Sequence, residues 1–119
     1  MNPGHTVTIT PADLHVEVRV DGEKIAETDH AVLLEETGMP TRYYMRPEEI
    51  RMDLFRPTTF KTQCPFKGEA SYWTLELNGA MHDGIVWSYE SPIADAQAIN
   101  GLLCFYNDRV DLTVDSVGV

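Results

Sequence analysis

The chain has 119 residues, 43% of them hydrophobic and 24% charged, which is the composition of a single globular domain. Its net charge of −10 at pH 7 argues against nucleic acid as a partner, because phosphate binding needs a cationic surface. No apolar run approaches the roughly 20 residues of a membrane-spanning helix, and the amino terminus lacks the pattern of a signal peptide. We therefore expect one domain over residues 1–119, in the cytoplasm, with neither nucleic acid nor a membrane as a partner.

The first clear pattern is "LHVEVRV", residues 14–20, in which apolar and polar side chains alternate as in a strand with one buried face. Asp21-Gly22 favours a tight hairpin turn, and residues 23–28 then form the expected return strand. Residues 31–36, "AVLLEE", contain an apolar run that is too short to define a helix. After the break at "TGMP", extended structure is expected to resume at residues 41–45.

The middle of the chain gives weaker signals. Pro47 followed by two glutamates favours the first turn of a short helix. Residues 56–70 are predicted to be irregular, because the prolines at 57 and 65 cannot lie in a central strand.

The clearest element is a β-hairpin formed by "SYWTLEL", the turn Asn78-Gly79 and "AMHDGIVWSYE". In this register Trp73 faces Gly84. Strict alternation then places Trp73 and Trp87 on opposite sides of the hairpin. A bulge at Gly84 would reverse that arrangement, and glycine within a strand is where bulges occur.

The last third of the chain contains one more expected helix and two strands. Ser91-Pro92 favours the start of about two helical turns that end near Gly101. "LLCFY" is typical of a buried strand, Asn107-Asp108 of a turn, and "RVDLTVD" of an alternating strand. Altogether the sequence predicts a compact, mostly β domain with seven to nine short strands and one or two short helices.

Metal and cofactor sites have little support in the sequence. Two cysteines, Cys64 and Cys104, are too few for a disulfide framework and are expected to be free thiols. The four histidines are scattered and no C-x-x-C is present. We expect no metal site and no cofactor.

Several motifs together resemble one known family. "VRVDGEKIAET", "CPFKGEASYW", "VWSYESP" and "GLLCFYNDRVDL", in this order, are similar to the domain of unknown function 427 family over about residues 5–114. The resemblance implies two small antiparallel sheets in a tent-like or sandwich-like arrangement, a shape that elsewhere hosts small-molecule pockets or zinc sites. A nucleotidyltransferase label accompanies the family. The chain departs from the family in having Gln63 where histidine is usual and His30 where arginine is frequent.

The leading functional hypothesis is a pocket for a small anionic or aromatic ligand, lying between the 64–73 segment and the strand at 87–89. Six of the nine basic residues lie between Arg42 and Lys67 against three acids, and the aromatic residues gather nearby. The alternative is that these cations only form salt bridges and the aromatic side chains only form core. The residues expected to bind the ligand are Arg42, Tyr44, Lys67, Gly68, Tyr72, Trp73, Trp87 and Tyr89.

Two other classes of function stay open. An enzyme could use Cys64 as a nucleophile if Lys67 lowered the pKa of its thiol, although Cys64 could equally fill space beside a turn. A nucleotidyltransferase needs paired carboxylates for metal ions, whereas Asp53 and Asp83 stand alone in the sequence. The third class is a structural module that forms a homodimer through a sheet edge.

Overall fold

The computed structural model describes residues 6–65 and 67–116, which contain ten strands in two antiparallel sheets. The larger sheet has the strand order β1-β4-β5-β9-β8-β7-β6 and the smaller one β10-β2-β3. The expected mostly β fold of two antiparallel sheets is therefore confirmed. The strands are β1 (Val7–Pro11), β2 (Leu14–Val20), β3 (Glu23–Thr28), β4 (Val32–Glu36), β5 (Arg42–Met45), β6 (Phe55–Cys64), β7 (Gly68–Leu77), β8 (Ala80–Ser88), β9 (Leu103–Phe105) and β10 (Asp111–Ser116).

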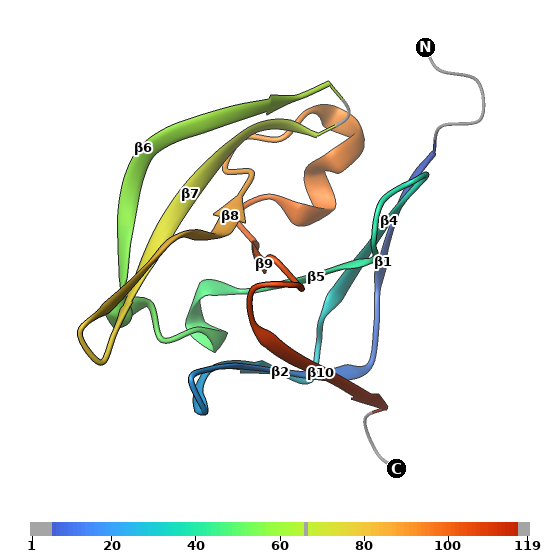
Figure 1. The fold of residues 1–119 in the computed structure, drawn as a ribbon. Coiled ribbons are helices and arrows are strands. Elements are labelled where there is room, and N and C mark those ends of the chain that lie inside the picture. The colour runs from blue at the N-terminus through green and yellow to red at the C-terminus, as the bar shows by residue number, and fades with distance from the viewer. Residues whose placement is uncertain (1–5, 66, 117–119) are drawn as a thin grey trace.

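The seven-stranded sheet is bent like a tent (Figure 1). Strands β6, β7 and β8 form one side, β1 and β4 form the other, and β5 and β9 lie between them. The three-stranded sheet lies across the bottom of this arrangement (Figure 1). The tent-like or sandwich-like shape that the family resemblance implied is thus a fair description of the fold.

The seven-stranded sheet buries side chains on both faces. Successive residues of a strand point to opposite faces, and here they enter two separate hydrophobic clusters. Val86 belongs to the first cluster, which lies between the two sheets and includes Val16 and Val18 of β2. Its neighbour Trp87 belongs to the second cluster, which also contains Ile99 of the following segment. The larger sheet is therefore the central layer of the molecule.

The helices that the sequence predicts are short 3-10 helices. They are η1 (Pro47–Glu49) and η3 (Ala94–Ile99), and a further 3-10 helix that was not predicted is η2 (Met52–Leu54). Pro47 occupies the first helical position, as expected from the missing backbone N–H of proline. The third helix begins later than predicted, at Ala94 rather than Pro92.

Most of the segment predicted to be irregular, residues 56–70, is instead extended, and that prediction was wrong over residues 56–64 in the edge strand β6 and over residues 68–70 at the start of β7. Pro57 lies within the strand opposite Trp73 of β7. An edge strand has one side without a partner strand, so it tolerates a residue that cannot donate a backbone hydrogen bond. Strand β1 was not predicted, because its five residues are too few to form a long alternating run.

The β7–β8 hairpin has the predicted register near its turn and departs from it farther out. Leu75 pairs with His82 as expected, but Trp73 pairs with Val86 rather than with Gly84. Three residues, 83–85, thus stand opposite one residue of β7. Because the bulge adds two residues, it preserves the alternation of faces, and Trp73 packs against the first cluster while Trp87 lies in the second.

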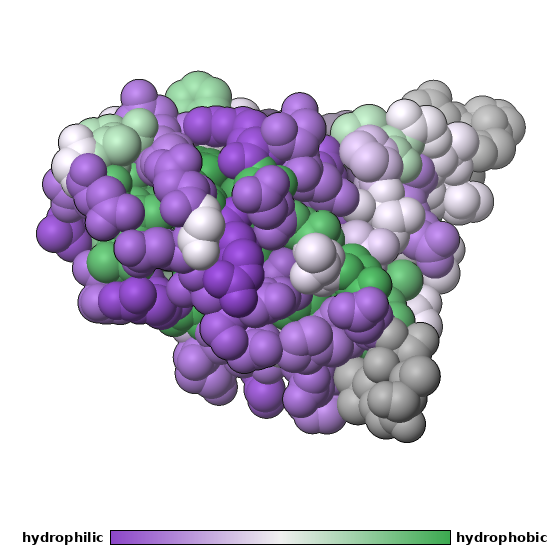
Figure 2. Space-filling model, turned by 60° about the horizontal axis from the view of Figure 1, so that its bottom comes forward, coloured by the Kyte–Doolittle hydropathy of each residue, from purple (hydrophilic) through white to green (hydrophobic). Residues whose placement is uncertain are grey.

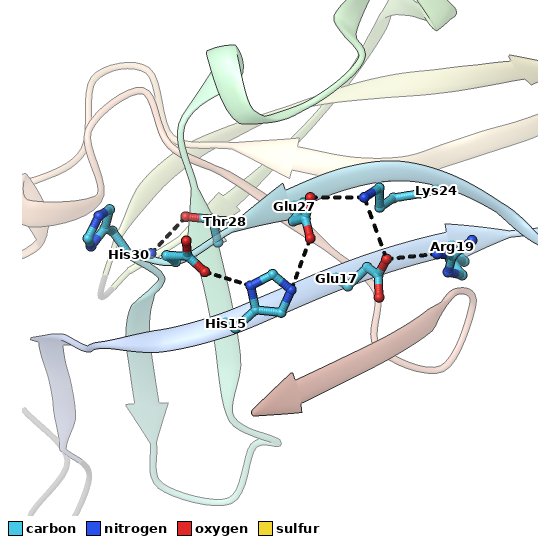
Figure 3. A network of polar contacts seen from close by, with 8 residues as sticks. His15, Glu17, Arg19, Lys24, Glu27, Thr28 and His30 are labelled. Atoms are coloured by element: carbon cyan, nitrogen blue, oxygen red, sulfur yellow. Dashed lines mark hydrogen bonds and ion pairs between the residues drawn. The ribbon is translucent and has the colours of Figure 1, made fainter. Parts of the chain in front are cut away.

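The outer face of the three-stranded sheet is polar. The surface on this side of the molecule is mostly hydrophilic, with hydrophobic atoms visible in narrow strips between polar side chains (Figure 2). His15 of β2 lies between the carboxylates of Asp29, at 2.6 Å, and Glu27, at 3.0 Å, next to further ion pairs of β2 and β3 (Figure 3). Within residues 6–65 and 67–116, no helix is both long enough and apolar enough to cross a membrane.

Candidate functional site

The bulge in β8 has a counterpart in β6. Pro57 pairs with Trp73, but Lys61 pairs with Ser71, so residues 58–60 stand opposite the single residue Tyr72. Strand β7 is therefore flanked on both sides by a three-residue bulge. The bulge of β6 stands opposite Tyr72 and the bulge of β8 opposite Thr74, only two residues farther along β7.

A cavity of about 600 Å³ lies between these bulges, on the face of the sheet that carries Tyr72. We call it the bulge cavity. Its floor comes from β7, two of its walls come from the bulges of β6 and β8, and a third comes from the turn between β9 and β10. The residues that line it are Thr58, Phe60, Tyr72, Thr74, Asp83, Gly84, Tyr106, Asp108 and Arg109.

Gly84 shapes the β8 wall of the bulge cavity. Its φ angle of 58° lies in the left-handed region, which glycine adopts without steric cost. Its backbone N–H donates a hydrogen bond to Oγ1 of Thr74 at 3.2 Å, which fixes the bulge to β7. A Cβ atom at this position would lie 4.0 Å from the Tyr72 ring, so the absence of a side chain leaves this part of the cavity open.

Three aromatic rings give the cavity an apolar interior. Phe60, which is 62% exposed, lies with its ring centre 5.2 Å from that of Tyr72. The Tyr72 hydroxyl is 2.8 Å from Oγ1 of Thr62. Burial, followed by a hydrogen bond with Tyr72, raises the pKa of Tyr106 to about 12, so this phenol is neutral at physiological pH.

The charged groups at the cavity are two carboxylates and one guanidinium. Arg109 donates a hydrogen bond from Nη2 to the carbonyl oxygen of Asp83 at 2.8 Å, and its guanidinium carbon lies 5.7 Å from the centre of the Tyr106 ring. The side chains of Asp83 and Asp108 form no ion pair with any residue that the structure describes. The lining therefore carries a formal charge of −1, from two acids and one arginine.

The aromatic residues expected to bind a ligand divide between the two faces of the sheet. Tyr72 lines the bulge cavity. Tyr44, Trp87 and Tyr89 are buried in the second cluster, between 0% and 6% exposed. Trp73 lies on the other face, against the first cluster, so it cannot share a pocket with Trp87.

The basic residues and the glycine expected at the site mostly have structural partners. The guanidinium carbon of Arg42 lies 5.0 Å from the Trp87 ring centre and 5.8 Å from that of Tyr106, behind the cavity lining. Lys67 is nearly buried and its Nζ lies 2.8 Å from Oε1 of Glu36. Gly68 faces the backbone of Pro92, where an added Cβ would approach Cα to 3.2 Å.

Most of the other cations between residues 42 and 67 also pair with acids. Lys61 is an exception, because its Nζ donates to Oγ of Ser71 at 2.8 Å. The remaining ion pairs are Arg46–Glu49 at 3.3 Å, Arg51–Asp53 at 3.9 Å and Arg56–Glu76 at 3.1 Å. The local excess of positive charge in the sequence is thus largely neutralised in the fold.

The residues considered for catalysis lie apart from one another. Cys64 is half-buried at the end of β6, and its carbonyl oxygen accepts a hydrogen bond from the backbone N–H of Lys67 at 3.2 Å. The ammonium group of Lys67 is directed to Glu36. Asp83 lines the bulge cavity, whereas Asp53 lies beside Arg51 in η2. Among the described residues, no three histidine, cysteine or acidic side chains come close enough together to hold a metal ion.

Sequence reasoning missed most of the cavity lining. Two signals were present: a glycine inside the predicted β8 strand, and a proline followed by two threonines at the start of β6. The missed residues from the β9–β10 turn carry no local signal, because only the strand pairing brings them to β7. The lining residues that were not predicted to bind a ligand are Thr58, Phe60, Thr74, Asp83, Gly84, Tyr106, Asp108 and Arg109.

Comparison with known proteins places the chain in a family. A sequence model named NTP_transf_9 and described as a domain of unknown function (DUF427) matches residues 8–116, a range that includes all the residues lining the bulge cavity. The comparison with curated proteins gave no match. Because the family match covers nearly the whole chain, the resemblance seen in the sequence motifs is confirmed, and the protein belongs to the DUF427 family.

Proposed function

We propose that this protein binds a small ligand with a flat, largely apolar body in the bulge cavity. The observation that carries the proposal is the lining itself, in which Phe60, Tyr72 and Tyr106 form part of the wall of a space of about 600 Å³. Small-molecule sites have volumes of roughly 300–1,000 Å³ and combine apolar walls with a few polar groups. The bulge cavity has both properties.

The exposure of Phe60 supports this proposal. A phenylalanine that is 62% exposed on an edge strand leaves apolar surface in water. Covering such surface stabilises a complex by about 25 cal/mol per Å². A planar ligand that lies against Phe60 and Tyr72 would bury this surface and gain favourable ring contacts, which contribute about 0.5–1.5 kcal/mol for an aromatic pair.

The backbone of the bulges supports a cavity that exists before a ligand arrives. The β8 bulge is held by the hydrogen bond from Gly84 to Thr74, and the turn after β9 is held to β8 by the bond from Arg109 to Asp83. Such preorganisation reduces the entropy lost on binding.

The charges favour the aromatic alternative over the anionic one. The cations that suggested an anion site in the sequence are mostly paired with acids elsewhere, as Lys67 is with Glu36. At the cavity, Asp83 and Asp108 outnumber Arg109. An anion would therefore meet a lining of its own sign.

The test is an NMR titration of the labelled protein with a panel of small planar ring compounds. Binding in the bulge cavity is expected to shift the amide signal of Gly84 and the ring signals of Tyr72 and Tyr106 together. Phe60→Ala is expected to weaken binding about tenfold, because one wall of the cavity is lost.

The matched control is Met81→Ala. Met81 is 57% exposed and lies in β8, but it does not line the cavity. This variant is expected to bind like the wild type. Ligand-induced shifts confined to other parts of the molecule, or equal affinities of Phe60→Ala and wild type, would refute the proposal.

A further inference from the structure

Resting on the proposed function, we propose that the ligand of the bulge cavity is an organic cation, with an ammonium, amidinium or guanidinium group attached to its flat apolar body. Two independent features of the cavity carry this inference. One is the pair of carboxylates that have no ion-pair partner among the described residues, and the other is the set of aromatic faces beside them.

Asp83 and Asp108 line two different walls of the bulge cavity. Asp83 belongs to the bulge of β8 and Asp108 to the turn between β9 and β10. Both residues are exposed, and neither side chain is in an ion pair within the described part of the chain. In contrast, several other acids of the protein, such as Glu36, are paired with a lysine or arginine. A cation on the ligand would supply the missing partner for both.

Arg109 offsets one of the two negative charges but forms no ion pair with either carboxylate. Its guanidinium donates to the backbone carbonyl of Asp83, not to the carboxylate, and it lies 5.7 Å from the centre of the Tyr106 ring. Its role in the geometry is to join the turn after β9 to the β8 bulge. The lining therefore keeps its net negative charge.

Aromatic faces attract cations because the ring quadrupole is negative above and below the plane. The protein already uses this attraction at Tyr106, whose ring lies near the guanidinium groups of both Arg42 and Arg109. The rings of Phe60 and Tyr72 have no such cation among the described residues. They are the faces left for the positive group of a ligand, beside Asp83.

The charge of the whole protein acts in the same direction. A net charge of −10 raises the local concentration of cations and lowers that of anions near the surface. The long-range and local electrostatics thus both select a cationic ligand over an anionic or neutral one of equal shape.

The test compares three probes of nearly equal size that differ in charge: benzamidine, benzamide and benzoate. Dissociation constants are measured by NMR titration at low salt, from the signals of Gly84, Tyr72 and Tyr106. Benzamidine is expected to bind about tenfold more tightly than benzamide, and benzoate more weakly than benzamide. In the double variant Asp83→Asn/Asp108→Asn, the preference for benzamidine is expected to fall to within about threefold.

The control is the double variant Asp13→Asn/Asp53→Asn, which changes the net charge by the same amount. Both residues are exposed and neither lines the cavity. This variant is expected to keep the preference for benzamidine, which separates local recognition from the overall charge.

The outcomes distinguish this inference from the proposed function. If benzamide or benzoate binds in the cavity as tightly as benzamidine, the cation inference is wrong while the proposed binding function stands. An unchanged preference in Asp83→Asn/Asp108→Asn, or an equal loss in the control variant, also refutes the cation inference. If none of the three probes, nor any compound of the wider panel, shifts the cavity signals, both proposals fail.

Discussion

Trp87 donates a hydrogen bond from its indole Nε1 to the phenolic oxygen of Tyr44 at 3.1 Å, and the two rings meet edge to face. The strands that carry them, β8 and β5, are not neighbours, because β9 lies between them and Cys104 pairs with both residues. The bond therefore passes over the small side chain of Cys104. It is a buried polar contact within the second hydrophobic cluster, which contains both Tyr44 and Trp87.

Replacing Tyr44 by Phe is expected to lower the free energy of unfolding by about 1–3 kcal/mol, because a buried N–H of Trp87 loses its acceptor. Urea denaturation followed by circular dichroism measures this change. Tyr43→Phe is the matched control, since Tyr43 is less buried and its hydroxyl has no hydrogen bond among the described residues. A loss for Tyr44→Phe no larger than that of the control would contradict the structural role of the bond.

The buried ion pair between Lys67 and Glu36 is expected to be strongly coupled. The side chains are only 11% and 8% exposed, so removing one partner leaves a charge with little access to water. Lys67→Met and Glu36→Gln should each lower the free energy of unfolding by about 3 kcal/mol, and the double variant should lose clearly less than the sum.

The comparison for this pair is the exposed pair Arg56–Glu76, whose side chains are 61% and 45% exposed. Its double-mutant cycle should give a coupling energy below about 1 kcal/mol, and this coupling should decrease in high salt. Equal coupling in the two cycles would show that the Lys67–Glu36 pair is more hydrated than its burial indicates.

Two glycines are expected to differ in their tolerance of alanine. At Gly84 an added Cβ has room, so Gly84→Ala should cost about 1 kcal/mol from the left-handed φ alone. At Gly68, where φ is 122°, the Cβ would also press on the backbone of Pro92, and the loss should exceed about 2 kcal/mol. Thermal and urea denaturation give both values. Gly84→Asn should be milder than Gly84→Ala, because asparagine adopts positive φ more readily.

The two thiols are expected to react very differently. Burial raises the pKa of the Cys104 thiol to about 12, and the side chain is fully buried. Cys64 is half-buried at the end of β6. In the folded protein, iodoacetamide at pH 8 should therefore label Cys64 and leave Cys104 unmodified, since the thiolate is the reactive form. Mass spectrometry locates the label. Modification of Cys104 at the same rate as Cys64 would show that the second cluster opens readily.

His15 is expected to stabilise the fold in its protonated form. The hydrogen bond with Asp29 raises the pKa of His15 above its ordinary value of 6.5. Because the pKa in the folded state is higher than in the unfolded state, this contribution is complete below about pH 6.5 and is lost as the pH rises through the raised value. The stability difference between wild type and His15→Gln should therefore shrink as the pH increases above 6.5.

An NMR titration of the His15 ring provides the direct measurement. Asp29→Asn should move the pKa of His15 back toward 6.5, since the largest cause of the shift is removed. A stability difference that grows with rising pH would contradict the assignment.

The hairpins were predictable from the sequence because their signals are local. The alternation in residues 14–20 and the turns at Asp21-Gly22 and Asn78-Gly79 each define a hairpin without reference to the rest of the chain. The bulges were not predictable in the same way. Whether a bulge at Gly84 contains one extra residue or two depends on where Val86 and Trp87 find space in the two clusters.

The candidate site was even less predictable from the sequence. Nearness along the chain grouped Lys67 with Trp73, although the fold directs the first to Glu36 and the second to the opposite face of the sheet. Tyr106 and Arg109 come to Tyr72 only because β8 lies beside both β9 and β7. Of the residues predicted to bind a ligand, Tyr72 alone lines the bulge cavity.

The bulge in β6 has a consequence for how molecules of this protein meet one another. A long, regular edge strand is a template onto which a strand from another molecule can add, which leads to aggregates. The interruption at residues 58–60 divides β6 into two short stretches. A homodimer formed through a sheet edge would therefore use β1 or β10 more easily than β6, and β3 less easily because its outer edge is bonded to residues 50–51. The same irregular residues that open a cavity on one side of the strand thus discourage the growth of fibres on the other.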